Sequence, residues 1–269
     1  MKKVVVTLTI ALLVLIFAVS AWMVGSYLVE SRQQAKENEE LANMVSKPTE
    51  SQPVTSDTTA ATTVEGTFGS AANLVDANGV LEEYSEALAK YPDMVGWIRI
   101  DGTKLNYPVM QTPDRPNYYL DHNLNGVSSA WGAIYAREEC DINKPSDNIT
   151  LYGHHMRDGS MFACLDTYKY KKTWDENPLI FFDTLYGYHV YKIFAVFTTS
   201  ANIGEGFSYH QMIDAKDKKD FDNFIAKCKE LSLYDTGVTP EYGDKTICLS
   251  TCEYSHDNGR LVVAAVRIS

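Results

Sequence analysis

Residues 248–268, CLSTCEYSHDNGRLVVAAVRI, predict the fold more clearly than any other stretch of the chain. Two apolar runs flank an Asp-Asn-Gly sequence at 257–259, a combination typical of a tight turn between antiparallel strands. Pairing of the runs brings Cys252, at the end of the first, close to Arg260, at the start of the second. A guanidinium there can stabilise a thiolate, or the oxyanion that forms when a thiolate attacks a carbonyl. In an arbitrary hairpin, an inert buried cysteine and a solvated arginine are the more common outcome.

Strand patterns recur through most of residues 73–269, a length that suits one core. Helical spacing predicts a helix from Leu81 to Tyr91 that stops at Pro92, and two later helices at 159–177 and 217–231. Together these patterns predict a mostly antiparallel β fold, either a barrel or a sandwich. The expected strands are 95–100, 104–111, 131–138, 148–155, 188–200, 244–254 and 260–268.

The sequence of the N-terminal region predicts a membrane anchor followed by a stalk. Residues 4–29 carry no charge, and about 20 apolar residues are enough to cross a bilayer as a helix. We expect a cytoplasmic segment at 1–3, a transmembrane signal-anchor at 4–29, a polar stalk at 30–72 and an extracellular folded domain at 73–269. Lys2 and Lys3 favour an inside N-terminus, although Arg32 and Lys36 weaken the contrast. A cleaved signal peptide ending near residue 20 is the alternative, but the apolar run continues past that point.

Composition excludes some functions. The formal net charge is −11 and no block of positive charge is present, which argues against nucleic-acid binding. Five cysteines are an odd number, so at least one is free or pairs with another chain. Cys248 and Cys252 are about 13 Å apart if they lie on one strand, too far for a disulfide. No C-x-x-C occurs, and we expect no metal or cofactor, although the acidic segment 141–147 is a weak cation candidate.

A nucleophilic cysteine needs a proton carrier, usually a histidine. His154 and His155 stand at the end of the expected strand 148–155. Neighbouring residues on a strand face opposite sides, so only one of the two can face Cys252, and spacing alone does not choose between them. We expect His189 to be packed or on the surface, and His256 to be exposed in the hairpin loop.

Three motifs, YGHHM at 152–156, CLSTCEY at 248–254 and GRLVVAAVRI at 259–268, together resemble the sortases, transpeptidases of Gram-positive cell surfaces. The similarity runs from about Leu81 to Ile268. It implies that Cys252 is the nucleophile, that His154 is the proton carrier and that Arg260 assists at the substrate carbonyl. One departure is Cys248, which stands where the family motif begins with Thr, and we expect it to be a core residue.

The class B subgroup is indicated by about 45 residues between the strand ending near Ser200 and the one starting near Lys245. This insertion, with its helix at 217–231 and a helical N-terminal extension, is similar to class B sortases. Class C enzymes usually carry a second membrane span near the C-terminus, which the sequence does not show. The resemblance implies a closed barrel of about eight strands. His155 replaces the Asn expected after the catalytic His.

The implied activity is that of a cysteine transpeptidase. It would cleave an Asn-Pro-x-Thr-Asn-like sorting signal after Thr, through a thioacyl-enzyme, and transfer the surface protein to an amine of peptidoglycan or its lipid-linked precursor. A backbone N–H near Cys252 or Glu253 would add to the oxyanion hole. Ser250, Glu253 and Leu120 are expected to line the substrate groove. The competing interpretations are a secreted cysteine hydrolase and a non-catalytic surface adhesin with Cys252 as a core thiol.

Overall fold

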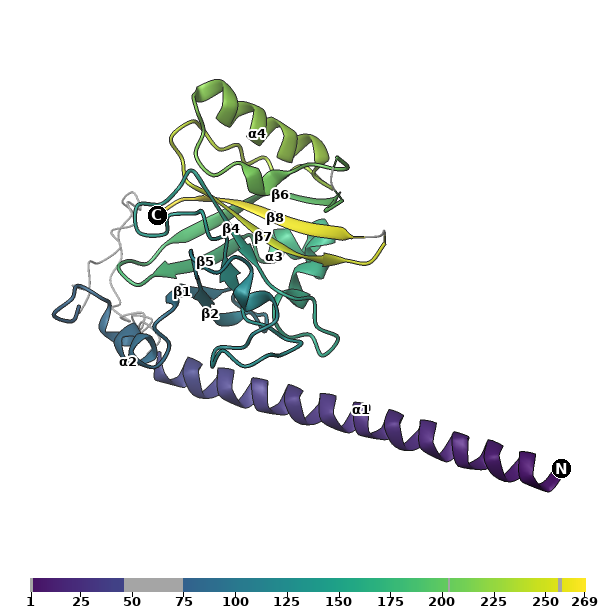
Figure 1. Ribbon diagram of the computed structural model, residues 1–269. Coiled ribbons are helices and arrows are strands. Elements are labelled where there is room, and N and C mark those ends of the chain that lie inside the picture. The colour runs from purple at the N-terminus through teal and green to yellow at the C-terminus, as the bar shows by residue number, and fades with distance from the viewer. Residues whose placement is uncertain (1, 46–74, 203, 256–257) are drawn as a thin grey trace, which may run out of the picture. The chain divides into compact units, whose positions relative to one another are not determined.

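The β-barrel carries the site. The structure, a computed structural model, describes residues 2–45, 75–202, 204–255 and 258–269. Within these residues, eight strands close into a barrel in the order β1-β2-β3-β4-β7-β8-β6-β5, as the resemblance implied (Figure 1). The strands are β1 (Met94–Arg99), β2 (Asn106–Met110), β3 (Tyr135–Ala136), β4 (Asn148–Tyr152), β5 (Leu179–Thr184), β6 (Val190–Ser200), β7 (Thr246–Glu253) and β8 (Gly259–Arg267).

Strand β8 is buried on both faces. Val262, Ala264 and Val266 pack in one cluster with residues of the insertion helix. Successive side chains of a strand point to opposite faces, so Leu261 and Val263, both fully buried, face the barrel interior. The apolar run in the sequence is continuous because both faces of β8 are covered.

Most neighbouring strands are antiparallel, but β4 and β7 pair in parallel, with Tyr152 opposite Ser250. The short β3 also pairs in parallel with β2, through Met110 and Tyr135. Parallel strands end at the same edge of a sheet. The residues that follow β4 therefore emerge beside the end of β7, a juxtaposition that the expected antiparallel pattern did not contain.

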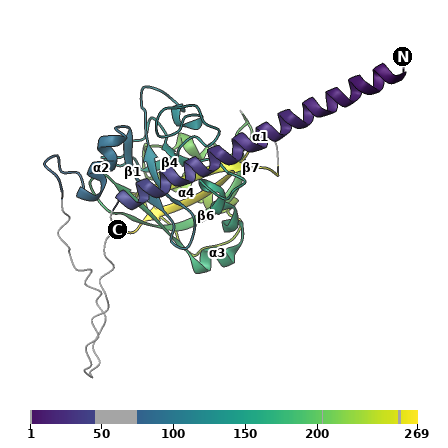
Figure 2. The ribbon, with the colours of Figure 1, turned by 90° about the horizontal axis from the view of Figure 1, so that it is seen from below.

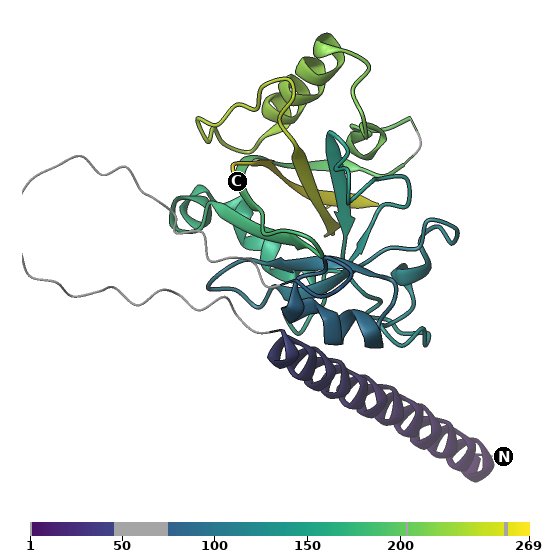
Figure 3. The ribbon, with the colours of Figure 1, turned by 90° about the vertical axis from the view of Figure 1, so that its left-hand side faces the viewer.

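Helices lie outside the barrel. They are α2 (Glu82–Lys90), η1 (Tyr118–Leu120), η2 (Phe162–Lys169), α3 (Lys171–Glu176), η3 (Tyr209–Gln211) and α4 (Lys218–Leu231), where η marks a 3₁₀ helix. The carboxylate of Asp217 caps α4 by accepting a hydrogen bond from the Asp220 N–H at 2.9 Å. Helix α4, expected at 217–231, packs on the β6 side of the barrel (Figures 1 and 3).

Three expectations on local structure were wrong. The helix expected at 159–177 is split into η2 and α3, because Tyr170 adopts an extended conformation. The strand expected at 131–138 is reduced to two residues. Gly132 has a φ of +56°, and a Cβ on it would come within 2.4 Å of the Tyr119 carbonyl oxygen, so the chain is not extended there. Strand β5 was not expected at all, although it follows Pro178 as a short apolar run.

Most of the N-terminal helix α1 (Lys2–Met44) belongs to a separate compact unit, Met1–Leu41. It is a single continuous helix, about 65 Å long at about 1.5 Å per residue (Figure 2). Its length and apolar composition are sufficient to cross a membrane, a test that a signal sequence also passes. The helix continues beyond residue 29 without a break. Most of the stalk expected at 30–72 lies outside the described residues, since residues 46–74 are not among them.

Candidate active site

Cys252 and Arg260 lie directly opposite one another on β7 and β8. This confirms the pairing that the Asp-Asn-Gly turn predicted. At the neck of the hairpin, a Cβ on Gly259 would lie 2.5 Å from the Glu253 carbonyl oxygen, so the close strand approach there requires glycine. Side chains of directly opposed residues on one sheet face are about 5 Å apart at Cβ, which brings the thiol and the guanidinium side chains together.

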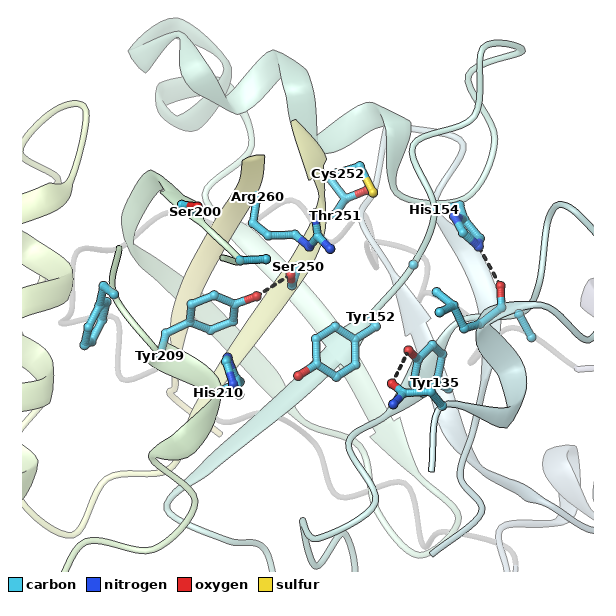
Figure 4. A pocket seen from close by; sticks show the side chains of 16 residues that line it. Tyr135, Tyr152, His154, Ser200, Tyr209, His210, Ser250, Thr251, Cys252 and Arg260 are labelled. Carbon is cyan, nitrogen blue, oxygen red and sulfur yellow. Dashed lines mark hydrogen bonds between the residues drawn. The ribbon is translucent and has the colours of Figure 1, made fainter. Parts of the chain in front are cut away.

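A pocket opens beside Cys252, and Figure 4 shows its lining. Of the residues predicted for the site, Cys252, His154, Arg260, Ser250 and Leu120 all line it. The complete lining is Asn117, Leu120, Ala133, Tyr135, Tyr152, Gly153, His154, Ser200, Ala201, Phe207, Tyr209, His210, Ser250, Thr251, Cys252 and Arg260. Residues from six segments of the chain, 117–120, 133–135, 152–154, 200–210, 250–252 and 260, thus form a single pocket. Cys252, His154 and Arg260, which are expected to carry chemistry, lie on its walls.

His154 enters the pocket from the end of β4. Its Nε2 lies 2.6 Å from the carbonyl oxygen of Leu120 (Figure 4). A carbonyl oxygen accepts hydrogen bonds and cannot donate them, so Nε2 carries the proton of this bond. The other ring nitrogen, Nδ1, is then the one that can exchange a proton with a bound substrate. The carbonyl of Leu120 therefore selects the tautomer and orients the ring.

His155 faces elsewhere. Its Nδ1 lies 3.3 Å from the carbonyl oxygen of Cys252, and its ring centre is 5.5 Å from that of Tyr254. It does not line the pocket. Strand β4 ends at Tyr152, so both histidines, which were expected within a strand at 148–155, lie just beyond its end, and their rings make different contacts. His155 contacts the main chain of β7, and His154 faces the pocket that holds the thiol.

Arg260 is held by the main chain of its own turn. Its Nη1 donates to the carbonyl oxygen of Gly259 at 2.9 Å and contacts that of Asn258 at 3.4 Å. The side chain is half-buried, which strengthens its electrostatic effect relative to a fully solvated position. In the view of Figure 4, the Cys252 sulfur lies between the Arg260 guanidinium and the His154 ring. In this view the thiol has a guanidinium on one side and an imidazole on the other.

An aromatic wall completes the pocket. The Tyr209 hydroxyl is 2.5 Å from Ser250 Oγ, and the Tyr135 hydroxyl donates to Asn117 Oδ1 at 3.0 Å. Burial raises the pKa of both tyrosines, so their hydroxyls stay neutral hydrogen-bonding groups. Sequence reasoning missed this wall. Tyr152 carried a usable signal, since it stands two residues before His154, whereas nothing in the sequence linked Tyr209 to the site.

Glu253 was expected to line the groove, and that expectation was wrong. Its side chain is only 6% exposed and lies 2.8 Å from Lys169 Nζ, away from the pocket lining. The reason is strand alternation, because Cys252 faces the pocket and the next residue must face the opposite side. The same alternation places Ser250 on the pocket face with Cys252.

Cys248, expected to be a core residue, is fully buried. It packs in one cluster with Phe221 and Cys228 of α4. Burial raises its pKa far above the usual range for a thiol. All five cysteines are free. Among the described residues, no group of three or more His, Cys, Asp or Glu side chains is arranged to hold a metal ion. His256 lies outside the described residues.

Known proteins resemble this chain in sequence and structure. The family model of the sortase domain matches residues 98–268, more than half of the chain. Sortase B of Listeria monocytogenes is 34% identical over 193 residues, which cover 70% of this chain and 75% of that protein.

Two solved structures extend the comparison. The Staphylococcus aureus sortase B–substrate complex has a TM-score of 0.65 at 29% identity, over 71% of this chain and 86% of that one. A sortase B complexed with triglycine has a TM-score of 0.63 at 28% identity, over 70% and 86% of the two chains. The family match, the relative and the shared barrel agree with one another. The chain therefore belongs to the sortase family and is a class B sortase, a cysteine transpeptidase.

Proposed function

We propose that Cys252, His154 and Arg260 carry out the transpeptidation and that the substrate is an Asn-Pro-x-Thr-Asn-like sorting signal, cleaved after Thr. The observation that carries the proposal is the meeting of these three side chains, from β7, the end of β4 and β8, on the walls of one pocket. A nucleophile, a proton carrier and a cation for the developing oxyanion are the groups that acyl transfer through a thioester needs.

In the first step, the Cys252 thiolate attacks the carbonyl carbon of the Thr, and the carbonyl π electrons move onto its oxygen. The Arg260 guanidinium stabilises that oxyanion. As the oxyanion collapses, the C–N bond breaks and the leaving amine takes a proton from His154 Nδ1. The products are a thioester on Cys252, a free amine and a neutral His154, which keeps its proton on Nε2 toward Leu120.

In the second step, the amine of the acceptor attacks the thioester carbonyl and gives a proton to His154 Nδ1. The second oxyanion forms in the same place and again faces Arg260. Its collapse expels the Cys252 thiolate and leaves a new amide bond. The imidazolium and thiolate are restored, so the cycle consumes no other reagent.

The pocket lining supports a peptide substrate with polar side chains. Next to the thiol it offers the Ser250 hydroxyl, and beyond it the Tyr209 hydroxyl and the Asn117 amide, while Leu120 adds an exposed apolar contact. We propose that Ser250 and Leu120 contact the sorting signal. Sortase B of S. aureus has been solved with a substrate, which supports the same use of the pocket here.

We propose that the acceptor is an amine of peptidoglycan or of its lipid-linked precursor. The structure of a sortase B complexed with triglycine supports an amine acceptor. We also propose that residues 4–29 anchor the chain in the cell membrane by a single pass, with residues 1–3 in the cytoplasm, 30–72 as a stalk and the catalytic domain, 73–269, outside. The apolar part of α1 supports the anchor.

The test uses the full chain in detergent with a quenched fluorescent Asn-Pro-Gln-Thr-Asn peptide, with and without triglycine or diaminopimelate. Cys252→Ala is the control, and products are identified by mass. We expect cleavage after Thr and an adduct of the acyl fragment with the amine, both absent in the variant. Cleavage to the free acid alone, whatever the acceptor, would indicate a hydrolase. No cleavage across a panel of related signals would contradict the proposed substrate.

A further inference from the structure

Helix η2 holds the main chain of His154 at its first end. The Phe162 N–H donates to the carbonyl oxygen of His154 at 2.9 Å. The Phe162 ring is fully buried and lies so close to Gly153 that a Cβ there would come within 2.8 Å of it. The end of β4, and with it the proton carrier, is therefore fixed against η2.

The other end of the same helix holds the residue that follows Cys252. Lys169 Nζ lies 2.8 Å from Glu253 Oε1 and 2.7 Å from Asp166 Oδ1. The second carboxylate oxygen of Glu253 accepts from the Ser255 N–H at 3.0 Å and from the Ser255 hydroxyl at 2.5 Å. Through Lys169, η2 is thus joined to the end of β7 and to the start of the hairpin turn.

The neighbours of Glu253 favour the ionised form of its carboxylate. Burial by itself raises its pKa, but hydrogen bonds from Lys169 and Ser255 outweigh burial and lower the pKa to about 2. A carboxylate that is only 6% exposed is costly without a cation beside it. The ion pair with Lys169 therefore compensates the burial of this carboxylate in the folded enzyme.

Glu253 has no access to a substrate in the pocket, because it points to the opposite face from Cys252. Any influence on the reaction must pass through the main chain of the strand. The carbonyl of Cys252 is restrained in the same region by His155 Nδ1 at 3.3 Å. The end of β7 is thereby held from the side that faces away from the chemistry.

We propose that Lys169 and Glu253 are positioning residues. Their ion pair joins η2 to the end of β7 and thereby sets the separation between Cys252 and His154. One helix, η2, contacts the main chain of His154 at its first end and the strand of Cys252 at its last end. The inference rests on the catalytic roles proposed above for those two side chains. A misplacement of about 1 Å in an active site can cost on the order of a hundredfold in rate.

The experiment uses the full chain in detergent and compares Lys169→Met, Glu253→Gln, the double variant and Lys169→Arg with the wild type. Lys172→Met is the matched control, since Lys172 is 84% exposed and its carboxylate partner is 3.8 Å away. Two readouts are taken: kcat and KM for peptide cleavage, and the pH dependence of Cys252 alkylation by iodoacetamide, followed by peptide mass. The alkylation profile reports the coupling of the thiol to His154 without any sorting signal, and His154→Ala supplies its uncoupled reference.

We expect Lys169→Met and Glu253→Gln each to lower kcat on the order of ten- to a hundredfold, with KM within about twofold. The double variant should be no slower than the slower single variant, because both act through one contact. Lys169→Arg should keep most of the activity, and the alkylation profiles of the two damaging variants should move toward that of His154→Ala. Glu253→Gln preserves side-chain size and serves if Lys169→Met does not fold.

Wild-type kcat together with a wild-type alkylation profile in both single variants would overturn the inference, as would an equal loss of activity in Lys172→Met. If no peptide is cleaved even by the wild type, the proposed substrate fails and the alkylation profile alone decides. A profile in Glu253→Gln identical to that of the wild type would then contradict the positioning role.

Discussion

Strand β7 carries two thiols on one face, four residues apart, in opposite surroundings. Cys248 is fully buried under α4, and burial raises its pKa. Cys252 is partly exposed in a pocket that also contains Arg260 and His154. The same side chain on the same strand is thus a packing group at one position and a candidate nucleophile at the other. What differs is the covering of the strand, since α4 covers one end and leaves the other open.

The boundary between the two environments lies at Ser250. Ser250 is 2% exposed, and its hydroxyl forms a hydrogen bond with the Tyr209 hydroxyl. Tyr209 belongs to the buried cluster under α4 and also lines the pocket. Tyr209 therefore contacts the apolar cluster under α4 with its ring and the polar pocket with its hydroxyl. Along this face of β7, the surroundings change from a buried core to an open pocket between Ser250 and Cys252.

The largest effect that the comparison predicts is on activity. Cys252→Ala removes the nucleophile and should lower the rate by at least about a thousandfold, as loss of a covalent nucleophile does elsewhere. Cys248→Ala should leave kcat within about twofold and cost about 1 kcal/mol of unfolding free energy, for the apolar volume it deletes. A peptide cleavage assay measures kcat, and denaturant unfolding measures the free energy of unfolding. Equal losses of activity in both variants would contradict the division of roles.

The next effect concerns the cation beside Cys252. Arg260→Ala should lower kcat by on the order of a hundredfold or more, because loss of one oxyanion donor has that cost in other enzymes. Arg260→Lys keeps the charge but not the fixed planar donors, and we expect an intermediate rate. Steady-state kinetics with KM and kcat resolved provide the check. A raised KM with an unchanged kcat would show that Arg260 only binds substrate.

The difference between the two thiols should become smaller if the packing of α4 over Cys248 is weakened. Phe221 of α4 is fully buried in the same cluster, and Phe221→Ala should cost about 3–5 kcal/mol of unfolding free energy. We expect native-state alkylation of Cys248 to become at least about tenfold faster as the helix opens more often. Alkylation of Cys252 serves as the internal reference and should stay within about twofold. Resistance of Cys248 in this variant would mean that α4 is not what protects it.

The smallest effect is on stability at high pH. Burial raises the pKa of Cys140 to about 11, and that of Cys248 further, against an ordinary value of 9.0. Above pH 9.0 the unfolded chain loses thiol protons that the folded chain keeps, so the unfolding free energy falls as the pH rises. Each thiol contributes about 1.4 kcal/mol per pH unit within its window. Urea unfolding from pH 8 to pH 10 should show a shallower decline in Cys248→Ala, and parallel curves would refute the assignment.

The sequence predicted the contacts between residues that are close together in the chain, but not those between distant segments. The Cys252–Arg260 pair followed from a local turn and a period of two, and the helix at 217–231 from its apolar stripe. His154 was singled out by resemblance, because the parallel pairing of β4 with β7 joins segments about a hundred residues apart in sequence. Nothing local in the chain encodes that pairing.

Other features depended on tertiary contacts that no pattern displays. Tyr209 reaches Ser250 from the short helix η3 before α4, and Leu120 offers its main-chain carbonyl to His154. Glu253 was misplaced for a different reason, since strand alternation was applied to its neighbours and not to it. Its partner Lys169 lies within the helix predicted at 159–177, but no pattern in the sequence indicated that this helix contacts the end of β7.

The most direct test of the account is to locate the acyl group during turnover. The full chain is mixed with a sorting-signal peptide in the absence of acceptor, quenched in acid, digested and analysed by mass. The account predicts a thioester of the fragment ending in Thr on Cys252, lost on addition of an amine and absent from Cys248. An acyl group on another residue, or cleavage of the peptide by Cys252→Ala at the wild-type rate, would contradict it.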